Sequence, residues 1–146
     1  MEITSPAFAD GGNIPSRHTC QGDDVSPELH ISGVPSGTKS MVLIMDDPDA
    51  PMGTWDHWIV FNIRPSTAVI PERGVPPGSV QGRNSWGSNS YGGPCPPSGK
   101  HRYVFKLYAL NKVLSVGHTT VKNDIYREMS GSVIAQAELT GLYQKS

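Results

Sequence analysis

Two acidic residues and two histidines stand at the ends of apolar segments of this chain. Asp47 and Asp49 follow one apolar run, His57 opens the next run, and His101 directly precedes a third. A carboxylate beside an imidazole can bind an anion when the ring is protonated, or a divalent metal when the ring is neutral. It can also support acid–base catalysis. The residue types alone leave these three kinds of chemistry open.

The first two apolar runs are predicted to form an antiparallel hairpin. Residues 40–45 and 57–63 are rich in strand-forming side chains, and their connection is shorter than the crossover that parallel strands need. In an antiparallel hairpin the end of the first strand lies beside the start of the second. We therefore expect Asp47 and His57 to meet at one mouth of the sheet, with Asp49 on the connecting loop. Such a mouth is a common place for a small polar ligand.

A third strand is predicted over Arg102–Leu110, where alternation makes one face more apolar than the other. This strand would bring His101 to a sheet end. The segment before it, residues 82–99, is a long irregular stretch rich in Gly, Ser and Pro. It also contains two aromatic residues and a cysteine that could be buried. We expect a structured functional loop here rather than a disordered linker.

The last quarter of the chain changes to a helical period. Val121, Ile125 and Met129 are spaced four residues apart, which predicts an amphipathic helix that ends before Gly131. A second, less regular helix is predicted to continue through about Tyr143. Elsewhere, strand-like runs alternate with turn clusters, and the chain contains 16 Gly and 13 Pro. This pattern favours a β-rich domain, with one or two late helices, over a helical bundle.

Length and charge exclude several classes of protein. The 146 residues fit one domain spanning 1–146, with a net charge of -1 and no run of Lys or Arg. This charge gives no electrostatic case for nucleic acid or an anionic membrane surface. No segment approaches the length of a transmembrane helix, and the N-terminus lacks the features of a signal peptide. We therefore expect a cytoplasmic protein that is not an integral membrane protein.

The two cysteines, Cys20 and Cys95, both lie in turn-rich segments. Free thiols are the commoner state in a cytosolic protein, and free thiols are our expectation here. If the two residues paired, the long closed loop would contribute on the order of 4 kcal/mol of stability. Neither cysteine has the neighbours of a zinc site, so no structural metal is predicted.

Several short motifs together resemble the phosphatidylethanolamine-binding protein family, which includes the Raf kinase inhibitor protein and the plant flowering regulators. The motifs that carry the resemblance are Asp47-Pro48-Asp49-Ala50-Pro51, His57-Trp58 and Gly93-Pro94-Cys95-Pro96-Pro97-Ser98-Gly99-Lys100-His101-Arg102-Tyr103. Shorter motifs are similar to the bacterial and archaeal branch of that family: Ser5–Phe8, Thr19–Gly22, Ser26-Pro27 and, as its last helix, Ala135–Leu139. The resemblance covers nearly the whole chain.

The resemblance implies a mostly β fold with a large central antiparallel sheet, a smaller sheet and one or two C-terminal helices. It also implies a small pocket that accepts phosphate-like groups and uses neither a metal nor another cofactor. The ligand-binding residues carried over by motif are Asp47, Asp49, His57, Gly93, Pro94, His101 and Tyr103. The Gly93–Pro97 loop would shape the rim.

The leading functional prediction is a binding protein for an anionic head group, such as phosphate, phosphoethanolamine or a phospholipid head group. His57 and His101 would donate charge-assisted hydrogen bonds, while the aspartates would orient the rings or meet an amine on the ligand.

A second prediction is an inhibitor that docks on a kinase or a serine protease, as family members are described. A hydrolase using the Asp/His cluster is the third. No GxSxG, HExxH or Walker motif is present, so binding is favoured over catalysis and no catalytic residue is assigned. Both a monomer and a homodimer remain open.

Overall fold

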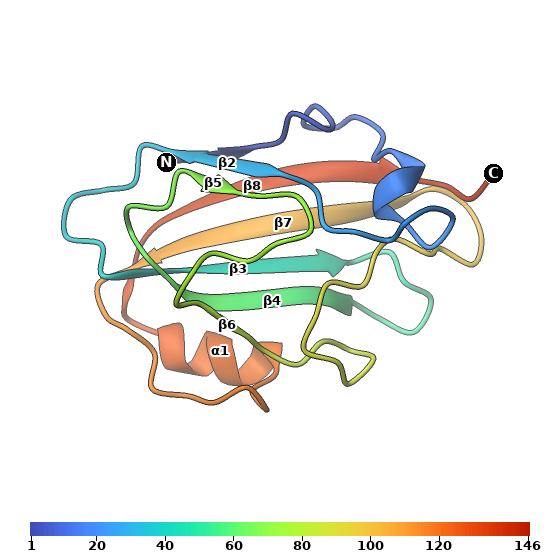
Figure 1. The fold of residues 1–146 in the computed structure, drawn as a ribbon. Helices are drawn as coiled ribbons and strands as arrows, with labels where there is room; N and C mark the ends of the chain where they lie inside the picture. The colour runs from blue at the N-terminus through green and yellow to red at the C-terminus, as the bar shows by residue number, and fades with distance from the viewer.

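The computed structural model describes all residues 1–146 and contains two antiparallel sheets and one α-helix (Figure 1). The large sheet has the strand order β6-β4-β3-β7-β8, with β3 at Ser40–Asp47, β4 at Trp55–Ile63, β6 at Val80–Gln81, β7 at His101–Leu110 and β8 at Val133–Tyr143. The small sheet has the order β1-β2-β5, with β1 at Glu2–Thr4, β2 at Leu29–Ser32 and β5 at Val69–Ile70. A short 3₁₀ turn, η1, covers Ser16–His18, and helix α1 covers Lys122–Met129. The mostly β fold predicted from the sequence is confirmed.

Strands β3 and β4 form the predicted hairpin, and both faces of β3 are covered. Met41, Leu43 and Met45 pack toward the small sheet in the main core. Val42 and Ile44 pack on the opposite face, in a second core that includes residues of α1. Because successive side chains of a strand point to opposite faces, the same alternation separates the two neighbouring acids at the end of β3. Asp47 lies on the small-sheet face, and Asp46 lies on the helix face.

One predicted element is wrong: the segment expected to form a second helix is strand β8. Gly131 has a left-handed φ of 79° just after α1, where the helix ends and the chain turns. Strand β8 then pairs with β7 along its length, for example Leu139 with Phe105. Its residues 135–138 (Ala, Gln, Ala and Glu) are helix formers, but the unpaired edge of β7 offers a full ladder of hydrogen bonds. Tertiary pairing therefore overrides local propensity.

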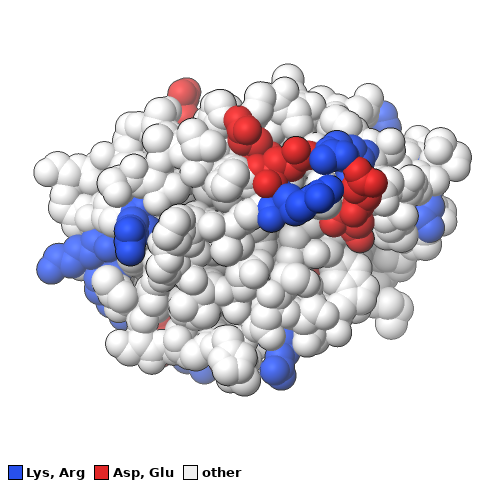
Figure 2. All heavy atoms as spheres, in the orientation of Figure 1, with Lys and Arg blue, Asp and Glu red and all other residues white.

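The surface agrees with the balanced composition. On the face shown in Figure 2, acidic and basic side chains adjoin one another at the upper right, and a few basic side chains gather at the left edge. Exposed ion pairs such as Arg17–Asp23 and Arg17–Glu72 are examples of this mixing. No helix of the chain combines the length and the apolar character needed to cross a bilayer.

Candidate functional site

A cavity of about 360 Å³ lies where β3 ends and where β4 and β7 begin. In Figure 1 these three strand ends gather at one side of the large sheet, beside the irregular segment before β7. The polar side chains that line the cavity are Asp47, His57, His101 and Tyr103. Apolar side chains make most of the remaining wall, namely Ala50, Pro51, Met52, Trp55, Trp86, Pro96 and Pro97. The hairpin therefore brings Asp47 and His57 together as predicted, and β7 adds His101.

The acidic residue of the cavity holds one of the histidines. His101 Nδ1 lies 2.7 Å from Asp47 Oδ2, and both side chains are buried. The other Asp47 oxygen accepts the backbone N–H of Asp49 at 2.8 Å. The carboxylate therefore fixes the ring by accepting the Nδ1–H, and His101 Nε2 has no partner within the chain.

His57 is oriented by the backbone of the irregular segment. Its Nδ1–H donates to the carbonyl oxygen of Gly92 at 2.7 Å, which leaves Nε2 without a partner in the chain. The ring packs edge-on against Trp86 and Tyr103, with centroid distances of 4.9 and 5.2 Å. This burial lowers the pKa of His57 below its usual value, although nearby aspartates oppose the shift. Near neutral pH the ring is uncharged, and its Nε2 is an acceptor.

Two further polar groups at the cavity are unpaired. The Tyr103 hydroxyl and the Trp55 Nε1–H are buried without a hydrogen-bond partner in the chain. Burial raises the pKa of Tyr103, so its hydroxyl stays protonated and available as a donor. Buried polar groups without partners are rare in folded proteins. The cavity thus combines unpaired donors with unpaired imidazole nitrogens, which suits a ligand that carries several oxygen atoms.

Asp49 does not line the cavity. Its carboxylate holds Arg102 through Oδ1–Nη2 and Oδ2–Nε contacts of 2.8 and 3.0 Å, and it accepts the Arg102 backbone N–H at 2.9 Å. The hydrogen bonds from Arg102 lower the pKa of Asp49 to about 2. Asp49 therefore ties the β3–β4 connection to the start of β7, at the edge of the site.

Gly93 and Pro94 do not line the cavity either, whereas Pro96 and Pro97 of the same loop do. The Gly93 N–H donates to Asp24 Oδ1 at 2.9 Å, and the Pro94 carbonyl accepts the Cys20 N–H at 3.1 Å. A Cβ atom at position 93 would collide with the Asp24 carboxylate and the His18 carbonyl, so only glycine fits there. These residues position the wall.

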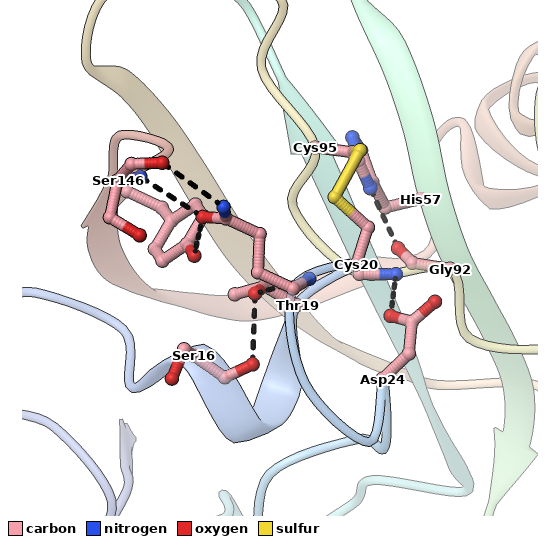
Figure 3. The surroundings of a disulfide bond; sticks show 11 residues. Ser16, Thr19, Cys20, Asp24, His57, Gly92, Cys95 and Ser146 are labelled. Atoms are coloured by element: carbon pink, nitrogen blue, oxygen red, sulfur yellow. Dashed lines mark hydrogen bonds between the residues drawn. A yellow bond between two sulfur atoms is a disulfide. The ribbon is translucent and has the colours of Figure 1, made fainter.

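The expectation of free thiols is wrong, because Cys20 and Cys95 form a disulfide. The two residues are 75 positions apart in sequence, and the fold brings their Cα atoms to 5.4 Å. Cys95 lines the cavity that also contains His57, and Figure 3 shows the disulfide beside that ring. The spacing of two cysteines in the sequence does not predict whether such distant residues pair. The site residues that the motifs missed are this disulfide and the aromatic pair Trp55 and Trp86.

The arrangement does not form a ready metal centre. Asp47 and His101 are hydrogen-bonded to each other, and no three His, Cys, Asp or Glu side chains in the chain converge as metal ligands.

Comparison with known proteins places this chain and its fold in one family. The family model described as "Phosphatidylethanolamine-binding protein" matches residues 4–144. A UPF0098 protein of Methanothermobacter thermautotrophicus is 50% identical, over 99% of this chain and 99% of its own length. The crystal structure of a putative phosphatidylethanolamine-binding protein homologue from Chlamydia trachomatis superposes with a TM-score of 0.96 at 44% identity, covering 99% of this chain and 97% of that one. E. coli YbcL superposes with a TM-score of 0.92 at 35% identity, covering 99% and 98%.

The chain belongs to the phosphatidylethanolamine-binding protein family, as its motifs indicate. Membership supports a ligand-binding protein in general terms.

Proposed function

We propose that the cavity binds a small ligand through an anionic, phosphate-type head group of the phosphoethanolamine kind. The observation that carries the proposal is the set of unpaired polar atoms at one small cavity. His57 Nε2, His101 Nε2 and the Tyr103 hydroxyl all lack partners in the chain. A tetrahedral oxyanion presents several acceptor oxygens, and a partly protonated one also presents a donor.

The cavity lacks a permanently positive side chain that could neutralise such a ligand. No Lys or Arg lines it, and Asp47 is a carboxylate. An anion therefore needs a compensating proton, carried either by an imidazole ring or by the ligand itself. Because His57 is neutral in the free protein near neutral pH, binding is coupled to proton uptake. Both oxygens of Asp47 already accept hydrogen bonds, which supports a role in orienting His101 over direct contact with an amine.

A second candidate is docking of a protein partner at the mouth of the cavity, as an inhibitor of a kinase or protease would require. The favouring observation is the apolar rim. The Met52 side chain is 96% exposed and Trp86 is 50% exposed, and both residues line the cavity. Clusters of exposed apolar side chains are typical of interaction sites.

The hydrolase alternative gains no support from the side chains of the cavity. Its lining contains no Ser, Thr or Lys, and the sulfur of Cys95 is held in the disulfide. The raised pKa of Tyr103 makes that hydroxyl a poor nucleophile. A binding role therefore remains the better proposal.

Replacing either cavity histidine is expected to weaken the binding of phosphoethanolamine by about thirtyfold, since a hydrogen bond to a charged group contributes roughly 2 kcal/mol. The variants are His57→Ala and His101→Ala, measured by titration calorimetry near pH 6. His118→Ala is the matched control, because that side chain is exposed and does not line the cavity. Failure of the wild-type protein to bind, or equal losses in all three variants, would overturn the proposal.

A further inference from the structure

The wall of the cavity contains a disulfide that solvent can reach. Cys20 and Cys95 are both exposed, and Cys95 lines the cavity. Exposed disulfides are the ones that reductants attack, whereas buried structural disulfides resist them. We infer that this pair is a thiol–disulfide exchange site that controls the cavity, with a small dithiol or a dithiol protein as the reductant. The inference rests on the anion site proposed above.

The disulfide divides the segment between β6 and β7 into two parts that are held differently. Residues 91–94 have several anchors besides the disulfide. The Tyr91 hydroxyl donates to the His18 carbonyl at 2.7 Å, and Gly92 N–H donates to the His57 carbonyl at 3.1 Å. The bonds of Gly93 and Pro94 to the 20–24 turn add two more. This part keeps its attachments without the S–S bond.

Residues 95–100 have few attachments other than the disulfide, namely the buried ring of Pro96 and the Cys95 backbone beside the Tyr103 hydroxyl. No backbone–backbone hydrogen bond involves any of them, and Pro96 and Pro97 have no N–H to offer. Their one side-chain bond is between Lys100 Nζ and Asn13 Oδ1, which is exposed and 3.4 Å long. Yet Cys95, Pro96 and Pro97 form one wall of the cavity. Apart from the packing of Pro96, the S–S bond is thus the main attachment of this wall.

Exchange with a dithiol needs no other reactant. One thiolate of the reductant attacks a sulfur of the Cys20–Cys95 bond, and the departing cysteine leaves as a thiolate that takes up a proton. The second thiol of the reductant then displaces the remaining cysteine and closes its own disulfide. Two electrons and two protons pass to the protein, which ends with two thiols, and the reductant is oxidised. Between the anchored residue 94 and β7, residues 95–100 then keep only the packing of Pro96 and weak polar contacts.

Release of the wall should weaken anion binding, because a ligand must order the freed residues again. Ordering a single residue costs roughly a tenfold factor in affinity, so the reduced protein is expected to bind inorganic phosphate about tenfold more weakly or worse. Phosphate is titrated by ³¹P NMR into oxidised protein, into protein reduced with dithiothreitol, and into the Cys20→Ser/Cys95→Ser variant. The last two should agree, and reoxidation should restore the affinity. Asn13→Ala, which removes the bond to Lys100 without changing any charge, is the matched control and should bind as the wild type does.

Limited trypsin digestion of the same native samples distinguishes a local release of the wall from loss of the whole fold. We expect faster cleavage after Lys100 in the two forms without the disulfide, while their far-ultraviolet circular dichroism stays that of the oxidised protein. Equal phosphate affinity in both redox states, or a disulfide that dithiothreitol reduces only in denaturant, would overturn the inference. Loss of the native circular dichroism spectrum at 25 °C in the forms without the disulfide would overturn it too, since the pair would then hold the whole fold and not the wall alone. If oxidised protein binds no phosphate at all, the failure lies with the proposed anion site.

Discussion

Replacing both Cys20 and Cys95 with serine is expected to lower the free energy of unfolding by about 4 kcal/mol. The disulfide joins residues 75 positions apart, and in the chain-entropy model a closed loop of that length restricts the unfolded chain by roughly this amount. A change of this size corresponds to a fall in Tm of roughly 12 °C for a chain of this length. Urea denaturation of the oxidised wild type and of the double variant measures the difference directly.

Wild-type protein in excess dithiothreitol serves as the control, because it should unfold at the same urea concentration as the serine variant. At 25 °C both are expected to remain folded, since a domain of this size normally has about 5–15 kcal/mol of stability. A loss below about 1 kcal/mol would contradict the account, because the disulfide would then restrict the unfolded chain very little.

Asp46→Asn is expected to destabilise the protein by about 3 kcal/mol, because breaking a buried ion pair leaves its partners without compensation. Asp46 is fully buried on the helix face of β3, where Oδ2 contacts Lys106 Nζ at 3.0 Å and Lys122 Nζ at 3.2 Å. Lys122 is the first residue of α1 and also contacts Asp56 Oδ1 at 2.6 Å. This cluster therefore fastens the start of the helix to the sheet.

Asp23→Asn is the matched control for that variant, because it breaks an exposed ion pair with Arg17 and should change stability little. Urea denaturation compares the two variants. The affinity of folded Asp46→Asn protein for phosphate should equal that of the wild type, because Asp46 lies on the face of β3 opposite Asp47. Equal stability of the two variants would show that the contact between Lys122 and Asp56 suffices to hold α1.

The parts of the site that the sequence predicts are those set by local geometry. A short connection between two apolar runs requires an antiparallel hairpin, and the hairpin alone places Asp47 near His57. The position of His101 at a strand end follows from the alternation in β7. Asp49 is close to them in sequence, but its partner is Arg102, whose position depends on how β7 packs beside β3. The sequence therefore places Asp49 near the cavity, but it does not predict that the carboxylate binds Arg102.

Long-range pairing decides the features that the sequence does not reveal. Residues 135–139 contain good helix formers, and only the free edge of β7 makes them a strand. The same holds for Cys20 and Cys95, whose approach depends on how the 20–24 turn packs against the segment before β7. The expectation of free thiols rests only on the usual redox state of a cytosolic protein. The structure contradicts it, because the two cysteines form a disulfide.

We propose that the cavity holds an anion by taking up a proton on His57, whose pKa in the free protein is lowered by burial. Sulfate tests it most directly, because the charge of sulfate does not change in the pH range where histidine titrates. We predict that sulfate affinity of the oxidised protein, measured by calorimetry between about pH 5 and pH 8, falls as pH rises, by up to about tenfold per pH unit for each proton taken up. His57→Asn should flatten the profile. Sulfate affinity that is independent of pH, or that strengthens as pH rises, would contradict the account.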